Sequence, residues 1–163
     1  MKKIYSFIAA LVVAMVVLAS CNNGMVYKSE LDNAKVAFEK KDWSAVDKAC
    51  STIFTNKDKA SAIDLAFAFV YKYNACFNKF GEDALSGRAS TFDEYIAGYQ
   101  KSLQILDAAK AKPDYEEALK VLEIIDVDVA QTEIAAKNSL ETLQNAAAKA
   151  RSAAEEEKAQ DEE

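Results

Sequence analysis

Apolar residues recur at intervals of three and four along most of the chain, the spacing that lines one face of an α-helix. The first predicted helix covers about residues 29–40 and has Ser29 as its N-terminal cap. The second follows a predicted cap at Asp42 and continues to about residue 54. Each has a single apolar face, and these faces hold Leu31, Ala34, Ala37 and Phe38 in the first helix and Val46, Ala49, Cys50 and Ile53 in the second.

The third predicted helix differs because apolar side chains surround much of it. It covers about residues 59–80, and Gly81 is expected to end it. Its large apolar side chains spread over an arc of roughly 200°. They are Ile63, Phe67, Phe69, Val70, Tyr71, Tyr73, Phe77 and Phe80. One neighbour cannot cover so wide an arc, so we expect this helix at the centre of the domain, packed on at least two sides.

The second half of the chain predicts one long loop and further helices. Residues 82–90 form the loop, and a capping box over residues 91–94 opens a fourth helix. A fifth helix follows Pro113, and residues 126–129 either interrupt it or lie within one helix that continues to about Lys149. Residues 146–163 hold three basic and six acidic groups and little to bury, so we expect a solvated, frayed or disordered tail.

Together these patterns predict an all-α domain over residues 29–145, a bundle of five or six helices in antiparallel hairpins. The 163-residue chain is 51% hydrophobic, and its four glycines and one proline are too few for a β-sandwich or barrel. It contains no histidine, which excludes Ser-His-Asp and Cys-His catalysis. A formal charge of -6 argues against a nucleic-acid partner, whose binding needs a basic face.

The N-terminus has a different pattern, in which two lysines precede an uncharged apolar run over residues 4–20. At 17 residues, the run is at or below the roughly 17–25 that span a bilayer as a helix. It ends in Leu18-Ala19-Ser20-Cys21, which resembles the lipobox of bacterial lipoproteins at all four positions. The resemblance implies that residues 1–20 are a signal peptide removed between Ser20 and Cys21, and that the Cys21 thiol carries a diacylglycerol. An uncleaved signal anchor with an unmodified Cys21 is the alternative.

The same resemblance implies a location in the bacterial envelope, with the membrane bound through the lipid on Cys21. Residues 22 and 23 are both Asn, and in lipoproteins the lack of Asp beside the cysteine favours release to the outer membrane. Residues 21–28 then form the lipidated cysteine and its tether, and the body faces the periplasm or the cell exterior. Loss of Lys2 and Lys3 changes the formal charge from -6 to -8, so anionic headgroups should repel the body.

Two segments of the body resemble each other and, in part, tetratricopeptide repeats. Residues 42–50 align with residues 114–122, an offset of 72 residues. In that family an acidic residue and an aromatic open the second helix of a repeat, an order that Tyr115, Ala118 and Leu122 follow. The offset is about twice the usual 34-residue period and no middle copy is present. A generic helical bundle is therefore the alternative, and no binding residue of the family is carried over.

Candidate chemistry is sparse in this chain. We predict no disulfide between Cys50 and Cys76, because a hairpin would separate them by roughly 18 Å along its axis. Glu123, Asp126 and Asp128 lack the surrounding loop that would supply the 6–8 or so oxygen ligands of calcium, so we expect a solvated face. Since we find no catalytic constellation, metal-ligand set or cofactor motif, we expect a protein that is not an enzyme.

Two functions fit these expectations. The first is an interaction or scaffold protein that holds a protein partner at the membrane through a helical surface. Its expected contact is the loop over residues 82–90, because loops carry function more often than the elements they connect. The second is a carrier or binding module for a small apolar ligand between the third helix and its neighbours. Phe69, Tyr71 and Tyr73 are its expected contacts, with core packing as the alternative for all three.

Overall fold

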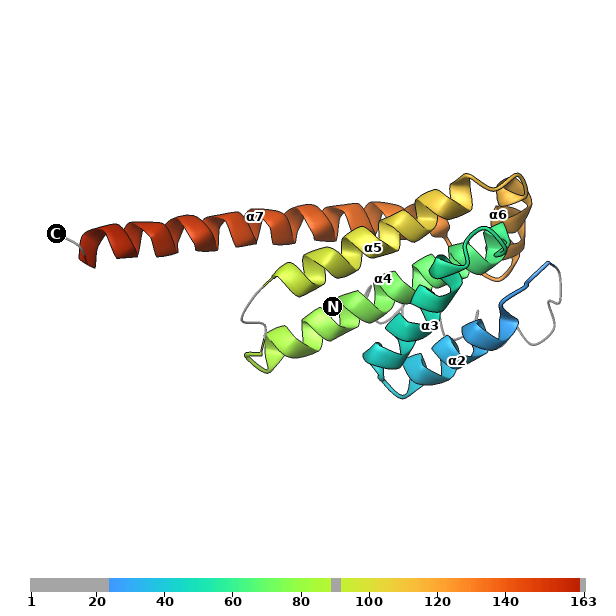
Figure 1. Cartoon of the computed structure of the whole chain (residues 1–163), viewed down its shortest axis with the longest axis horizontal. Coiled ribbons are helices and arrows are strands. Elements are labelled where there is room, and N and C mark those ends of the chain that lie inside the picture. Colours follow the sequence, from blue (N-terminus) through green and yellow to red (C-terminus); the bar gives the residue numbers. More distant parts are fainter. Residues whose placement is uncertain (1–23, 89–91, 162–163) are drawn as a thin grey trace.

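The computed structural model describes residues 24–88 and 92–161, and the secondary structure of this part of the chain is all helical, as predicted (Figure 1). The predicted signal peptide, Ser20 and Cys21 lie outside the described residues. Six helices follow one another: α2 (Lys28–Glu39), α3 (Trp43–Thr55), α4 (Ala62–Leu85), α5 (Asp93–Lys110), α6 (Tyr115–Ile124) and α7 (Val129–Asp161). The expected all-α bundle of five or six helices is confirmed.

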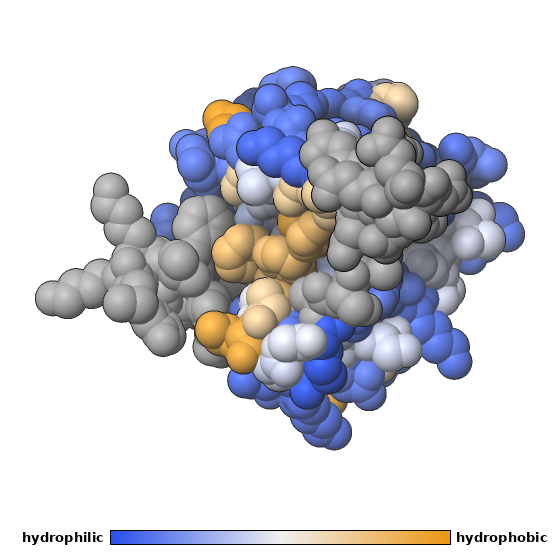
Figure 2. Space-filling view, turned by 90° about the vertical axis from the view of Figure 1, so that its left-hand side faces the viewer, coloured by the Kyte–Doolittle hydropathy of each residue, from blue (hydrophilic) through white to orange (hydrophobic). Residues whose placement is uncertain are grey.

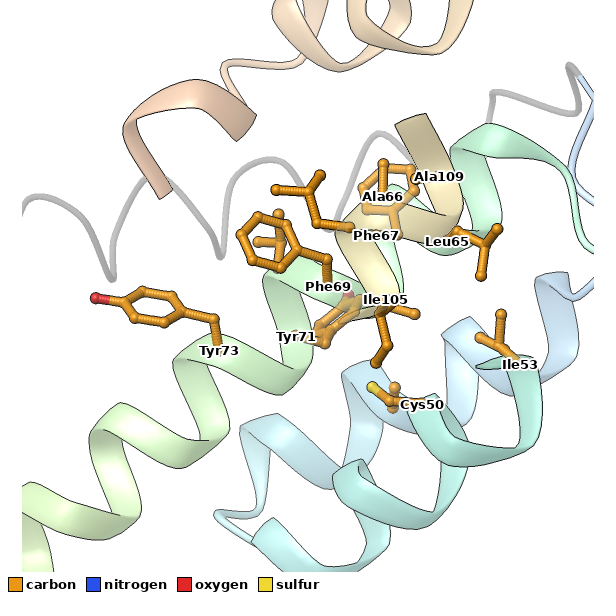
Figure 3. Packing of buried hydrophobic residues seen from close by; sticks show 14 of the residues in the cluster. Cys50, Ile53, Leu65, Ala66, Phe67, Phe69, Tyr71, Tyr73, Ile105 and Ala109 are labelled. Atoms are coloured by element: carbon orange, nitrogen blue, oxygen red, sulfur yellow. The ribbon is translucent and has the colours of Figure 1, made fainter. Parts of the chain in front are cut away.

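Helix α4 is the centre of the bundle. It contacts each of the other five helices, and its first ten residues, 62–71, are all buried. Figure 1 shows α3 and α5 lying along different sides of it, and Figure 3 shows its side chains pointing into the layers around it. The prediction of a central helix packed on at least two sides is therefore confirmed.

Helix α7 lies antiparallel to α5 and continues beyond it. Lys110 at the end of α5 pairs with Glu133 near the start of α7 at 2.7 Å, and Asp93 at the start of α5 pairs with Arg151 at 2.8 Å. Beyond this second pair, α7 extends past the end of the bundle with no described helix beside it (Figure 1). Its helical backbone includes residues 146–161; the fraying expected of this segment stays a prediction.

Side-chain caps start helices α3 and α4. Asp42 caps α3 as predicted, accepting a hydrogen bond from the Ala45 amide at 3.0 Å. Ser61 caps α4 in a capping box with Asp64, so this helix begins three residues later than expected. The predicted cap Ser29 is wrong, because α2 already begins at Lys28 and its cap position makes no side-chain bond. Thr91, the predicted cap of α5, lies outside the described residues.

The end of α4 corrects the sequence prediction. The helix continues through Gly81 to Leu85, so the first part of the loop expected over residues 82–90 is helical. It ends where Gly87 adopts the left-handed conformation, with φ of +70°. There the Arg88 amide donates to the Asp83 carbonyl oxygen at 2.8 Å, closing a Schellman motif.

The alternative in which the chain breaks after the fifth predicted helix is the one observed. Asp126 is left-handed, with φ of +65°, and the Val127 amide donates to the Leu122 carbonyl oxygen at 2.9 Å. Asp128 then begins α7 by accepting from the Gln131 amide at 2.8 Å. Helices α6 and α7 are therefore separate, and α7 is free to turn back along α5.

Candidate functional site

The three aromatic residues expected to contact a ligand or partner are buried in the bundle (Figure 3). Phe69 is 0% exposed, Tyr71 2% and Tyr73 5%. The Tyr71 ring lies 6.2 Å from that of Phe38, and the Tyr73 ring lies 5.9 Å from that of Tyr99. These contacts agree with the alternative that all three residues pack in the core.

The two cysteines of the bundle are free and buried, which confirms that they do not form a disulfide. Burial raises the pKa of Cys50 to about 12 and that of Cys76 to about 12. Both therefore stay protonated at neutral pH, and a protonated, covered thiol is a poor nucleophile. Cys50 has the predicted role of a small core residue, because it is fully buried among α2, α3 and α4 (Figure 3).

An apolar cleft of about 270 Å³ lies between α4, α5 and α7. We call it the α4–α7 cleft, and its lining residues are Phe77, Phe80, Tyr99, Asn138, Ser139, Thr142 and Leu143. The two phenylalanines come from the C-terminal half of α4, within the wide apolar arc that the sequence predicts. No charged side chain is among these lining residues, so the cleft suits an uncharged, largely apolar molecule.

Hydroxyl groups lie beside the apolar wall of the α4–α7 cleft. The Ser139 side chain lies beside the side chains of both Tyr73 and Tyr99. Burial raises the pKa of both phenols, so they are neutral donors or acceptors at any ordinary pH. A ligand in the cleft could thus bury an apolar body and bond one polar group. The α7 side of the cleft has no signal in the sequence, because only tertiary packing brings it beside α4.

A second groove, of about 470 Å³, runs between α3 and α5 over α4. Its lysines already have partners: Lys72 pairs with Asp47, and the Lys79 Nζ lies 2.7 Å from the Glu94 Oε1. Lys101 lies over the Phe54 ring at 4.2 Å from its centroid. Because these cations are engaged within the protein, the groove offers little charge to an anionic ligand.

The end of α4 is held to its neighbours by two carboxylates. Glu82 accepts a bond from the Trp43 indole nitrogen at 2.9 Å, which lowers the pKa of that carboxyl. Asp83 accepts from the Tyr95 hydroxyl at 2.7 Å and from Arg88 at 3.0 Å, and these bonds lower its pKa to about 2. Part of the predicted contact loop therefore has a structural role, and charge reversal there would weaken the contacts of α4 with α3 and α5.

Two large apolar side chains are strongly exposed at opposite ends of the bundle. Leu85, the last residue of α4, is 92% exposed, and Ile124, the last residue of α6, is 83% exposed. Figure 2 looks onto the end where α4 stops, and it shows apolar surface near the centre of this face. Leu85 is therefore an accessible apolar contact for a macromolecular partner at this end, beside the charged, projecting part of α7.

The predicted acidic group lies around the turn between α6 and α7. Glu123, Asp126 and Asp128 are exposed, which confirms the prediction of a solvated face, and they line a shallow cleft of about 310 Å³. Within the described ranges, no group of three or more acidic or thiol side chains is arranged to hold a metal ion.

The described helices also give no candidate for a membrane span, since none is both long and apolar enough to cross a bilayer. Comparisons of the chain with protein-family models, with curated proteins and with solved structures find no match. The two candidate surfaces are an apolar cleft between α4 and α7 and an exposed bundle end formed by α4 and α7.

Proposed function

We propose that the protein is a lipid-anchored, non-enzymatic interaction module of the bacterial envelope, held to the membrane through Cys21. It binds a protein partner through the bundle end that carries Leu85 and the projecting part of α7. The observation that carries this proposal is the extension of α7 past the body (Figure 1). A helix without a neighbour is an open surface of regular geometry, onto which a partner helix can pack.

The length of α7 supports this role. Its 33 residues measure about 50 Å at 1.5 Å per residue. The part before Arg151 is fastened to α5, and residues 151–154 beyond it are exposed. The helix therefore has a rigidly held base and an accessible tip, an arrangement suited to contacting another protein at a distance from the bilayer.

The test is photo-crosslinking in intact cells from position 85, followed by mass spectrometry of the trapped species. We expect one recurrent protein partner in a fixed ratio. Leu85→Lys should abolish capture by a tagged full-length chain, because it places a charge in an apolar contact. It should leave the fold intact, since a cation suits the last residue of a helix.

Ile124→Lys is the matched control, because Ile124 is also an exposed apolar residue that ends a helix, but at the other end of the bundle. We expect it to retain the partner. Equal capture by both variants, or no recurrent species from position 85, would contradict a contact at this bundle end.

The α4–α7 cleft supports a second candidate, a carrier for a small apolar ligand. Native mass spectrometry after mild extraction should then show a bound molecule, and Phe80→Ala and Ser139→Ala should each reduce its occupancy. Thr52→Ala, on the surface of α3, should leave occupancy unchanged. An empty protein after mild extraction would contradict this candidate and leave the first unaffected.

A further inference from the structure

Asp64 is a buried carboxylate whose bonds reach beyond its own helix. Its side chain is 0% exposed, at the third position of α4. Within the capping box it accepts from the Ser61 amide at 3.0 Å and from the Ser61 hydroxyl at 2.8 Å. A buried charge is costly without such partners, and the start of a helix is the favourable end for an acidic group.

The same carboxylate binds the segment that leads into α2. Its Oδ2 accepts from the Val26 amide at 3.0 Å, and its Oδ1 accepts from the Tyr27 amide at 3.2 Å. These amides precede α2, whose cap residue Tyr27 makes no side-chain capping bond of its own. A side chain 37 residues away thus fixes the entry to α2, and it joins this segment to the first turn of the central helix.

The held segment lies at one end of the bundle, opposite the tip of α7. Gly24 lines a cleft with Ile63 at the start of α4 and with Asp114, Glu117 and Ala118 beside α6. Figure 1 shows this segment and α6 at one end of the molecule, and the last residues of α7 at the other. The chain therefore enters the bundle far from the surface proposed to bind a partner.

We infer that Asp64 is a latch that sets how the anchored protein stands on the membrane, and so which surface it presents. This inference rests on the proposed lipidation of Cys21. Four residues separate Cys21 from Val26, so their Cα atoms lie at most about 18 Å apart. The bundle end containing the starts of α4 and α6 then faces the lipid, and Leu85 and the tip of α7 face away from it.

The bonds to Asp64 shorten the flexible part of the tether and fix the point at which it joins the bundle. Without the bonds to Asp64, the chain between Cys21 and Lys28 would leave the bundle free to tumble at the lipid surface. With them, about 50 Å of α7 points into the space away from the anchoring bilayer. The partner that fits this geometry is a protein of the same compartment whose binding segment is displaced from the lipid surface.

The first test is amide hydrogen exchange on the purified full-length chain. We expect Val26 and Tyr27 to be protected in the native protein. In Asp64→Asn these two amides should exchange at least about tenfold faster, because hydrogen bonds to a charged group are strong and the new amide group supplies a donor where acceptors are needed.

Two further variants keep this test decisive. Asp114→Asn is the matched control, because Asp114 accepts from the Ala62 amide at 3.2 Å at the same helix start, whereas the Val26 and Tyr27 amides bond to Asp64. Its exchange at Val26 and Tyr27 should match the native protein. Val26→Pro removes one latch donor and leaves Asp64 unchanged, so it should accelerate exchange at Tyr27 even where Asp64→Asn does not fold. Unprotected Val26 and Tyr27 in the native chain would overturn the latch.

The second test measures orientation on phosphatidylcholine vesicles that carry a quencher on their headgroups. Fluorophores are attached to Lys59→Cys, on the turn before α4, or to Ala154→Cys, near the tip of α7; both positions are exposed. The buried thiols of Cys50 and Cys76 should not react. We expect strong quenching at position 59 and little at position 154, and a smaller difference after Asp64→Asn.

The outcomes separate the inference from the proposed function. Intact mass measurement of the same sample shows whether Cys21 carries lipid. An acylated Cys21 with equal quenching at positions 59 and 154 would overturn the orientation and leave the anchor standing. An unmodified Cys21 would overturn the anchor and with it the orientation, whereas amide exchange would still decide whether the latch exists.

Discussion

At the scale of single residues, the Tyr71 side chain combines burial with an unsatisfied polar group. Its hydroxyl is buried and has no hydrogen-bond partner among the described residues. Burial raises the pKa of the phenol, so the hydroxyl is neutral at physiological pH. A buried donor without a partner costs about 1–3 kcal/mol, which makes this position a source of instability in the core.

Tyr71→Phe should therefore increase the free energy of unfolding, by about 1 kcal/mol. Tyr99→Phe is the matched control: Tyr99 is 1% exposed, but its hydroxyl is not among the described buried polar atoms that lack a partner. That variant should lose about 1 kcal/mol. Urea denaturation of both proteins measures the two changes, and a destabilised Tyr71→Phe would mean that its hydroxyl has a partner after all.

The roles of individual residues could be predicted from the sequence where they depend on local geometry. The lack of a disulfide between Cys50 and Cys76 follows from helix rise alone, and it is confirmed. The capping pair Ser61 and Asp64 fits a recognised spacing, so a closer reading of the sequence could have found it. The bonds from Asp64 to residues 26–27 could not be predicted, because no local pattern links positions 37 residues apart.

At the scale of elements, the helix ends depend on residues that accept a left-handed backbone. A left-handed residue follows three of the helices: Lys41 follows α2 with φ of +57°, Gly87 follows α4 with φ of +70°, and Asp126 follows α6 with φ of +65°. The sequence pointed to Gly81 as the end of α4, but glycine within a helix costs only about 1 kcal/mol. Because the helix continues, Glu82 and Asp83 can accept hydrogen bonds from Trp43 and Tyr95. The helix then ends at the left-handed Gly87.

The two glycines should respond in opposite directions to substitution by alanine. Gly81→Ala should stabilise the protein by about 0.5–1 kcal/mol, because a Cβ there meets nothing within 4 Å and the helix gains propensity. Gly87→Ala should cost about 1–2 kcal/mol, because a left-handed backbone strains a residue with a side chain. Thermal and urea denaturation compare the two, and changes of the same sign would contradict the assigned helix end.

The contact between α4 and α5 depends on a third glycine. A Cβ on Gly98 would lie 2.7 Å from the Cys76 sulfur, so Gly98→Ala should destabilise the protein by about 1–3 kcal/mol. Adding Cys76→Ala removes the clash and should restore much of that loss. A double-mutant cycle on unfolding free energies measures the coupling, and additive effects would mean that a Cβ at position 98 does not clash with the Cys76 sulfur.

At the scale of the whole molecule, the sequence predicted the bundle and its central helix, but it did not predict the course of α7 or the end at which α7 projects. The wide apolar arc of α4 identified the centre, because so many large side chains need several neighbours. The return of α7 along α5, the cleft it forms with α4 and its extension past the body depend on the break at Asp126. Both alternatives for that break were compatible with the sequence, so these features required the structure.

The orientation of the molecule relative to the membrane depends on where the chain is anchored. With a lipid on Cys21, the latch at Asp64 places the start of α4 near the bilayer and the tip of α7 away from it. Without a lipid, the same bundle would have no defined orientation. The orientation of the molecule thus depends on one modification, the lipid on Cys21.

The most direct test is mass spectrometry of the full-length protein extracted from its own membranes. We predict a chain that begins at Cys21, has 143 residues if the tail is intact, and carries the added mass of a diacylglycerol and an amino-terminal acyl group. Cys21→Ser should abolish both the added mass and the membrane association. An unmodified Cys21 still preceded by Ser20 would contradict the lipid anchor, and with it the proposed function at the membrane.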